Sequence, residues 1–143
     1  MVGIDNDRFC SASRDTTVRI WTRVDGHFIQ TGVFTKHSHF VNALALTPDG
    51  LVVSAGNDKT IFTFDPSNPD QFVYKLEGHS DNVCALGVSK EGAIVSGSWD
   101  KTARVWIDGK CVYVLKGHEF AVWGVLWIGK DVLTGDLCLC SVC

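Results

Sequence analysis

Short apolar runs alternate along the chain with turns rich in Gly, Asp, Asn and Pro. Four such runs follow one another at 40–47, 51–56, 60–64 and 72–76, and four more at 82–89, 93–98, 102–106 and 111–117. Short runs rich in β-branched and aromatic residues, separated by tight-turn residues, predict β-strands joined as hairpins. No segment has the pattern of a helix, so the predicted fold class is all-β.

These runs carry an internal repeat. A turn Asp recurs at intervals of 43 and 42 residues, and an aromatic residue recurs at the same intervals. A His recurs at intervals of 42 and 39, and a Ser or Thr follows it after 17, 17 and 16 residues. The recurring residues are Asp15, Asp58 and Asp100; Trp21, Phe64 and Trp106; His37, His79 and His118; and Ser54, Ser96 and Thr134. A period of about 42 residues is that of a propeller blade.

We call these two sets, the Asp with its aromatic residue and the His with its Ser or Thr, the two markers of the repeat. They resemble the recurring residues of WD-repeat β-propellers. In that family the His, the hydroxyl residue, the Asp and the Trp form a hydrogen-bonded tetrad, which the resemblance implies here. Asp would accept from backbone N–H groups and from His, His would donate onward to the hydroxyl, and the hydroxyl would meet the indole N–H. The expected members are Ser11, Asp15 and Trp21; His37, Ser54, Asp58 and Phe64; His79, Ser96, Asp100 and Trp106; and His118 and Thr134. Phe64 has no N–H, so the second network should end at Ser54.

Residues 1–143 are expected to form one partial WD-repeat propeller of about three and a half four-stranded antiparallel blades, too few to close a ring. The expected units are a truncated first blade at 1–36, a second blade at 37–78, a third blade at 79–117 and an incomplete blade at 118–143. The first unit lacks the Gly-His loop and an opening strand. The last has an atypical tail from 136, with Cys138 at the position of the turn Asp.

A closer resemblance is to the phospholipase A-2-activating protein family. It is carried by SGSWDKTARVW, KCVYVLKGH and AVWGV, and it extends back through SAGNDKTIFTF and SASRDTTVRIW. The resemblance implies a non-enzymatic module that binds ubiquitin, or another protein, in ubiquitin-dependent protein turnover. The family's further domains, which recruit the hexameric segregase valosin-containing protein, are not expected in this chain.

Candidate partner-binding residues lie beside the two markers. By analogy with WD-repeat proteins, residues before each turn Asp and residues after each loop His lie near the top rim of the propeller. These are Arg14, Asn57 and Trp99, and Phe40, Asn82 and Phe120. Trp99 is either an exposed anchor, since aromatic residues dominate interface hot spots, or a residue packed between blades. For Trp123, packing between blades is the favoured interpretation.

Composition narrows the class of partner. A net charge of -3 and a pI near 5.9 give no basic field for a phosphate backbone, so nucleic acid is not expected. No uncharged apolar run reaches the ~18 residues of a membrane span. The six cysteines follow no signal segment, which favours a reduced, intracellular protein. The expected location is the cytoplasm, with the nucleus as an alternative.

Two chemical interpretations carry less weight. His79, Ser96 and Asp100 are the residue types of a hydrolase triad, but no G-x-S-x-G elbow surrounds the serine and the set recurs at a blade period. Cys138, Cys140 and Cys143, with His118, could offer ligands to zinc, but their spacing is not that of structural zinc sites. No cofactor, metal or enzymatic activity is expected. The runner-up function is a WD-repeat scaffold of an assembly without ubiquitin, which a pull-down would distinguish.

Overall fold

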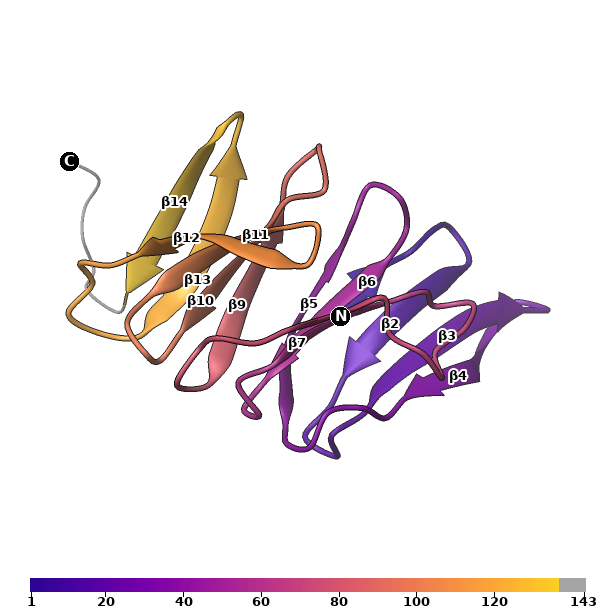
Figure 1. Cartoon of the computed structure of the whole chain (residues 1–143). Coiled ribbons are helices and arrows are strands. Elements are labelled where there is room, and N and C mark those ends of the chain that lie inside the picture. Colours follow the sequence, from indigo (N-terminus) through magenta and orange to yellow (C-terminus); the bar gives the residue numbers. More distant parts are fainter. Residues whose placement is uncertain (137–143) are drawn as a thin grey trace.

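The computed structural model describes residues 1–136, which form four antiparallel β-sheets. Within that range there are fourteen strands and no helix. Figure 1 shows the sheets side by side in chain order along an arc, from β4 at one end to β14 at the other. We call the sheets blades 1 to 4. They form an open propeller, as the sequence predicts.

Blades 1 and 2 each hold four strands, and neighbours in the chain are neighbours in the sheet. Blade 1 contains β1 (Val2–Gly3), β2 (Arg8–Ala12), β3 (Val18–Val24) and β4 (His27–Phe34). Blade 2 contains β5 (Val41–Leu46), β6 (Val52–Gly56), β7 (Ile61–Phe64) and β8 (Tyr74–Leu76). In each blade the first strand forms one edge of the sheet, and we call it the inner strand.

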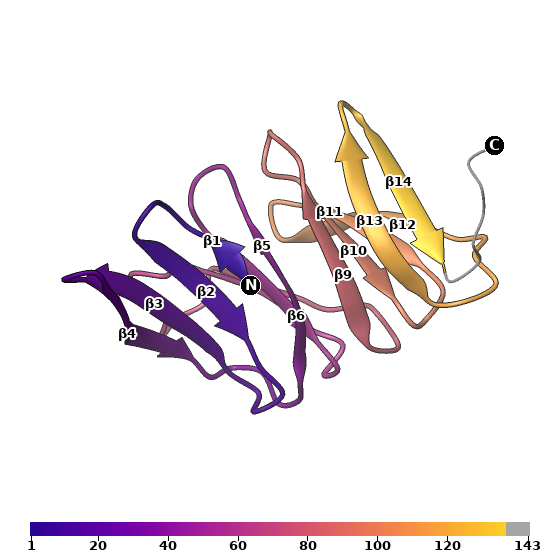
Figure 2. The ribbon, with the colours of Figure 1, turned by 180° about the vertical axis from the view of Figure 1, so that it is seen from behind.

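Blade 3 has four strands and blade 4 has two. Blade 3 contains β9 (Val83–Val88), β10 (Ile94–Ser98), β11 (Ala103–Ile107) and β12 (Lys110–Leu115). Blade 4 is the hairpin of β13 (Val122–Ile128) and β14 (Asp131–Asp136). The inner strands β5, β9 and β13 lie next to one another, which Figure 2 shows from behind.

Asp-Gly turns close the same hairpin in blades 1 and 3. Asp25 and Gly26 have φ angles of 49° and 82°, and Asp108 and Gly109 have φ angles of 48° and 77°. Positive φ at both central residues defines the type I′ turn, whose twist matches that of the flanking strands. The two Asp-Gly pairs therefore fix the registers of β3 with β4 and of β11 with β12.

The hydrophobic core lies between the blades. Phe34 of blade 1 stacks on Phe64 of blade 2 with ring centroids 4.1 Å apart and planes 5° from parallel. Trp106 of blade 3 packs against Val53 and Ile61 of blade 2. Val122 of blade 4 completes a third cluster with Val95, Ala103 and Val105 of blade 3. Because each blade buries its apolar face against its neighbour, stability is shared between adjacent repeats.

The outer face of blade 4 is apolar and open. Leu126, Ile128 and Leu133 are 58%, 52% and 54% exposed. Alternate residues of the same hairpin, Val125 and Trp127, pack toward blade 3, as the two-residue period of a strand requires. Within residues 1–136, this face of the β13–β14 hairpin is therefore an exposed apolar surface.

One expectation for blade 1 is wrong. β1 pairs antiparallel with β2, with Val2 opposite Cys10 and Gly3 opposite Phe9, so the blade does have a short opening strand. Two residues are too few to show the hydrophobic alternation from which a strand is predicted.

Candidate functional site

Blade 3 contains a chain of four hydrogen-bonded side chains. Asp100 Oδ2 lies 2.7 Å from His79 Nδ1, and His79 Nε2 lies 2.8 Å from Ser96 Oγ. Trp106 Nε1 donates to the same Ser96 Oγ over 2.8 Å. Asp100 also accepts two backbone N–H groups, at 3.0 and 2.9 Å. The structure thus brings the four marker residues of the third repeat into one network, in which buried polar groups are paired.

The protonation of His79 sets the direction of this network. Burial lowers the pKa of His79, and its interactions with Asp100 oppose this only in part. Burial pushes the pKa of Asp100 upward, but hydrogen bonds from Thr102 and His79 outweigh it and hold that pKa at about 2. Neutral His79 therefore donates from Nδ1 to the carboxylate and accepts at Nε2 from the Ser96 hydroxyl. The expectation that His donates onward to the hydroxyl is corrected: the hydroxyl is the donor.

Blade 2 repeats the network without its last member. His37 Nδ1 lies 2.7 Å from Asp58 Oδ2, and His37 Nε2 lies 2.8 Å from Ser54 Oγ. Phe64 has no N–H and stacks on Phe34 instead, so this chain of hydrogen bonds ends at Ser54. Burial pushes the pKa of Asp58 up, but hydrogen bonds from His37 and from two backbone N–H groups bring it below its usual value.

Blade 1 has an arginine where the other blades have a His. Trp21 Nε1 donates to Ser11 Oγ over 2.9 Å. Asp15 Oδ2 accepts from Arg19 Nη2 at 3.0 Å, and this ion pair is exposed to solvent. Arg19 stands four positions after the turn Asp and bonds its Oδ2. The corresponding Oδ2 atoms of Asp58 and Asp100 are bonded by His37 and His79.

Arg104 stands at the same position in blade 3, where the Asp100 carboxylate is already taken by His79. Arg104 Nε is buried without a hydrogen-bond partner among the described residues. Its Nη1 forms one long hydrogen bond within the described range, to Cys111 Sγ at 3.9 Å. The nearby positive charge adds to the lowering of the His79 pKa. Arg104 is thus a cation that the blade 3 network leaves without a carboxylate.

Blade 4 uses a different Asp from the one expected. His118 Nε2 lies 2.7 Å from Thr134 Oγ1, and His118 Nδ1 lies 3.2 Å from Asp136 Oδ2. Asp136, the last residue of β14, takes the role that the spacing assigns to Cys138. Cys138 itself lies outside the described residues, as do Cys140 and Cys143. Both ring nitrogens of His118 are engaged, so its imidazole is not free to bind zinc with them.

A groove of about 570 Å³ crosses the rim formed by the loops of blades 1 to 3 and the start of β13. We call it the rim groove. It is lined by five of the six predicted partner-binding residues, Arg14, Phe40, Asn57, Asn82 and Trp99. Asn42, Cys84 and Trp123 line it as well. The sixth predicted residue, Phe120, is 54% exposed but is not among the lining residues.

Three groove side chains stand on β-bulges at one repeated position. The pairing of β5 with β6 skips Asn42, that of β9 with β10 skips Cys84, and that of β13 with β14 skips Trp123. A bulge re-aims its extra side chain and bends the strand. Asn42 and Cys84 were not predicted from the sequence. Each of them, like Trp123, directly follows the first Val of an inner strand, which is buried, and this shared position could have identified them.

The bulge side chains also connect neighbouring blades. Asn42 Nδ2 donates to the Val83 carbonyl of blade 3 over 3.1 Å, and Cys84 Sγ donates to the Val122 carbonyl of blade 4 over 3.1 Å. Burial raises the pKa of Cys84 to about 11. The thiol therefore stays protonated at neutral pH and serves as a donor, not as a nucleophile or metal ligand. These bonds between blades hold the floor of the rim groove.

Aromatic rings form both walls of the groove. Trp99 and Trp123 lie with ring centroids 5.4 Å apart and planes at 56°. They are 45% and 44% exposed, so each ring touches the neighbouring blade and still presents surface to solvent. On the other side, the Arg14 guanidinium lies 5.8 Å from the centre of the Phe40 ring, within the range of a weak cation–π interaction. Packing and exposure, which the sequence left as alternatives for Trp99, occur together.

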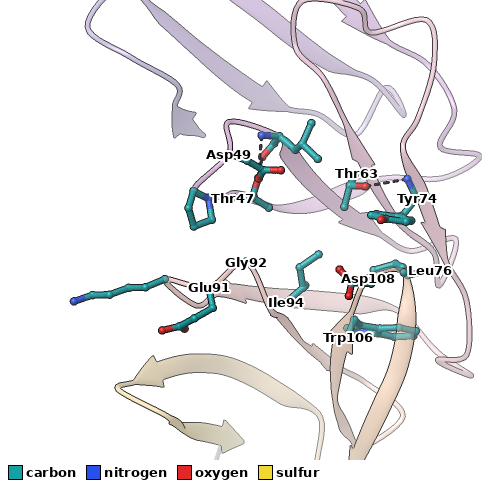
Figure 3. Close-up of a pocket in the computed structure, with 14 residues that line it drawn as sticks. Thr47, Asp49, Thr63, Tyr74, Leu76, Glu91, Gly92, Ile94, Trp106 and Asp108 are labelled. Atoms are coloured by element: carbon teal, nitrogen blue, oxygen red, sulfur yellow. Dashed lines mark hydrogen bonds between the residues drawn. The ribbon is translucent and has the colours of Figure 1, made fainter.

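A second hollow, of about 330 Å³, opens at the other end of blades 2 and 3 (Figure 3). Figure 3 shows Thr47 and Asp49 of blade 2 across the hollow from Ile94 and Trp106 of blade 3. The Trp106 N–H is already bonded within the blade 3 network. None of the predicted partner-binding residues lines this hollow, so the rim groove is the candidate site.

No group of three or more His, Cys, Asp or Glu side chains among residues 1–136 is placed to hold a metal ion. The described part of the chain also contains no helix of the length and apolarity needed to cross a membrane.

Comparison with protein families identifies the repeats. The description "WD domain, G-beta repeat" matches residues 3–22, 28–65 and 70–106, which is more than half of the chain. The chain therefore belongs to the WD-repeat family.

Its relatives within that family agree with the closer resemblance noted in the sequence. The chain is 39% identical over 127 residues to phospholipase A-2-activating protein of Xenopus laevis and 36% identical over 126 residues to protein DOA1 of Saccharomyces cerevisiae. It is 38% identical over 121 residues to ubiquitin homeostasis protein lub1 of Schizosaccharomyces pombe. These matches cover 82%, 86% and 77% of this chain, but only 16%, 17% and 16% of the relatives.

A solved structure shares the fold. The WD40 β-propeller domain of Doa1 superimposes with a TM-score of 0.85 at 34% sequence identity. The match covers 93% of this chain and 46% of that one. The chain thus corresponds to about half of a WD40 propeller and resembles the phospholipase A-2-activating protein family, as the sequence predicts.

Proposed function

We propose that the chain is a non-enzymatic interaction module that binds ubiquitin in its rim groove and acts in ubiquitin-dependent protein turnover. The observation that carries the proposal is the exposed pair of Trp99 and Trp123 at the wall of a groove that also gathers Arg14 and Phe40. Support comes from the 38% identity to a relative named for ubiquitin homeostasis, lub1 of Schizosaccharomyces pombe.

The tryptophan side of the groove suits an apolar patch on a folded partner. Two indole rings, each close to half exposed, offer a large apolar area on a rigid support. Aromatic side chains held in this way lose little conformational entropy on binding, which is why they recur as interface anchors. The bulge under Trp123 and the contact with Trp99 fix the orientation of both rings before a partner arrives.

The two asparagines that line the groove, Asn42 and Asn57, suit a peptide group. Asn42 Nδ2 donates to Asn57 Oδ1 over 2.6 Å and to the Val83 carbonyl over 3.1 Å, which uses both of its hydrogens. Asn42 Oδ1 and Asn57 Nδ2 are left as one acceptor and one donor with no partner among the described residues. A backbone amide presents the complementary donor and acceptor. Arg14, exposed beside Phe40, adds a cation at the edge.

Catalysis is not part of the proposal. Ser96, the serine of the triad-like set, is fully buried, and its oxygen is held between His79 and Trp106. A nucleophile must reach a substrate and must have oxyanion donors beside it. WD-repeat propellers are typically interaction modules, and the buried network stabilises the blade.

A titration of ¹⁵N-labelled ubiquitin with the unlabelled chain tests the proposal. We expect saturable shifts in one apolar surface patch of ubiquitin. Trp99→Ala should weaken the affinity by about tenfold or more, because truncation of an aromatic anchor commonly costs about 2 kcal/mol. The matched control is Tyr113→Ala, which removes a 65% exposed ring on β12 outside the groove and should leave the affinity unchanged. Absence of shifts at millimolar chain, or equal binding by Trp99→Ala, would refute the proposal.

A further inference from the structure

A buried donor without an acceptor lies at the end of the molecule opposite the rim groove. The indole Nε1 of Trp127, on β13, is buried and has no hydrogen-bond partner among the described residues. The ring lies against the inner strand of blade 3, where a Cβ atom added to Gly87 would be 3.6 Å from Trp127 Cδ1. A buried N–H without an acceptor is uncommon in native proteins and calls for an explanation.

A second buried donor lies in the same place. Ser89 is 5% exposed, and its Oγ accepts the N–H groups of Glu91 and Ala93 at 3.2 and 3.1 Å. Its own O–H has no acceptor among the described residues. Thr47, which opens the corresponding turn of blade 2, donates its hydroxyl to the Leu51 carbonyl over 3.1 Å. The Ser89 hydroxyl of blade 3 therefore has a hydrogen available to donate, whereas the Thr47 hydroxyl of blade 2 donates its hydrogen within its own turn.

The two residues that carry these donors, Ser89 and Trp127, line one hollow of about 410 Å³ between the β9–β10 turn and the β13–β14 turn. Lys90 and Lys130 line it too, and neither forms an ion pair within residues 1–136. Glu91 supplies the one negative charge among the lining residues. Figure 3 shows Glu91 on the side of its turn away from Thr47 and Asp49, toward blade 4. The lining residues thus carry a net charge of one positive unit.

We propose that this hollow binds the carboxylate of an acidic peptide segment, with Trp127 Nε1–H and Ser89 O–H donating to its oxygens and Lys90 and Lys130 supplying the opposite charge. A carboxylate offers two acceptor oxygens to two donors. The single excess positive charge, with Glu91 beside it, matches a monoanion better than a phosphate dianion. The volume lies within the usual range of ligand sites. Because Trp127 Nε1 is buried in the ligand-free chain, the side chains that cover it must shift to admit the carboxylate. This site is independent of ubiquitin binding in the rim groove.

The Trp127 indole resonance of the ¹⁵N-labelled chain provides the test, and it is assigned as the signal missing from Trp127→Phe. The probe is an acetylated, amidated Glu-Glu-Glu peptide, with Gln-Gln-Gln as the neutral control at equal ionic strength. We expect the glutamate peptide to shift the Trp127 indole and the Ser89 amide saturably and the glutamine peptide to shift neither. The Trp99 and Trp123 indoles should not move.

Variants define the contribution of charge. Lys130→Gln should weaken the binding affinity for the glutamate peptide about two- to fivefold, which is the range expected for loss of a partly exposed ion pair. The matched control, Lys116→Gln, removes an exposed lysine that does not line the hollow and should change nothing. No shift at tens of millimolar peptide would show that the hollow holds water alone, and the proposal would be wrong. Equal shifts with both peptides, a shift with inorganic phosphate only, or unchanged affinity of Trp127→Phe measured on the Ser89 amide would also overturn it.

Discussion

Ser96→Ala should cost more free energy of unfolding than Ser54→Ala, although the two serines have nearly the same surroundings. Both are fully buried, and each Oγ lies 2.8 Å from the Nε2 of the His in its blade. Only Ser96 also accepts an indole N–H, that of Trp106, over 2.8 Å. Blade 2 has Phe64 at that position, so Ser54 has one partner where Ser96 has two.

The magnitude follows from the groups left unpaired. Either substitution leaves one buried His nitrogen without a partner, which costs about 1–3 kcal/mol. Ser96→Ala also leaves the Trp106 N–H without an acceptor, which adds about 1–3 kcal/mol more. The difference between the two variants should therefore be about 1–3 kcal/mol.

Urea denaturation followed by far-UV circular dichroism measures this difference. A double-mutant cycle isolates its cause: in a Trp106→Phe background the indole donor is gone, and the cost of Ser96→Ala should fall to that of Ser54→Ala. Equal losses for the two single variants would refute the reasoning. So would an excess cost for Ser96→Ala that persists in the Trp106→Phe background.

Three further predictions concern packing, charge and pH. Gly97→Ala should destabilise the chain by about 1–3 kcal/mol, because a Cβ there would lie 2.8 Å from a carbonyl oxygen of blade 4. In the control variant Gly124→Ala the added Cβ meets nothing within 4 Å, so the same denaturation assay should show little effect. Arg104→Met should leave the melting temperature unchanged or raise it, because it removes a partly buried cation with an unpaired Nε; a clear fall would contradict this account of Arg104. Acid should destabilise the fold in two stages, because the folded-state pKa values of His79 and Asp100 both lie below their ordinary values, 6.5 and 3.8. As the pH falls, each group takes up its proton in the unfolded chain before it does so in the folded chain. Stability is therefore lost below about pH 6.5 and again between about pH 4 and 2. Denaturation midpoints that stay constant from pH 7 to 5 would contradict the lowered His79 pKa.

The repeat made most of the fold predictable. The period of the Asp, His and aromatic markers predicts blades, and the turn residues between the apolar runs predict the hairpins that the structure contains. The hydrophobic pattern also predicts that the chain is all-β. What it could not predict is β1, because a strand of two residues has no alternation to detect.

The rim groove was predictable only in part. Residues beside the turn Asp, such as Trp99, are found by counting from the marker. Asn42 and Cys84 are not, because their exposure to the groove depends on bulges, and a bulge is a property of the pairing of two strands and not of one strand's pattern. Asp136 was missed for a related reason: the position of a side chain at the end of β14 depends on where the strand stops, which spacing from Thr134 alone does not determine.

If the rim groove binds ubiquitin through its tryptophan wall, the indole spectrum of the chain should report the binding. The chain has five tryptophans, so the ¹⁵N–¹H spectrum contains five indole signals at distinct places in the fold. On addition of unlabelled ubiquitin we expect saturable shifts of the Trp99 and Trp123 indole signals. The signals of Trp106, buried in blade 3, and of Trp127, at the opposite end, should stay in place. Shifts confined to Trp127 or Trp21, or none at millimolar ubiquitin, would contradict ubiquitin binding in the rim groove.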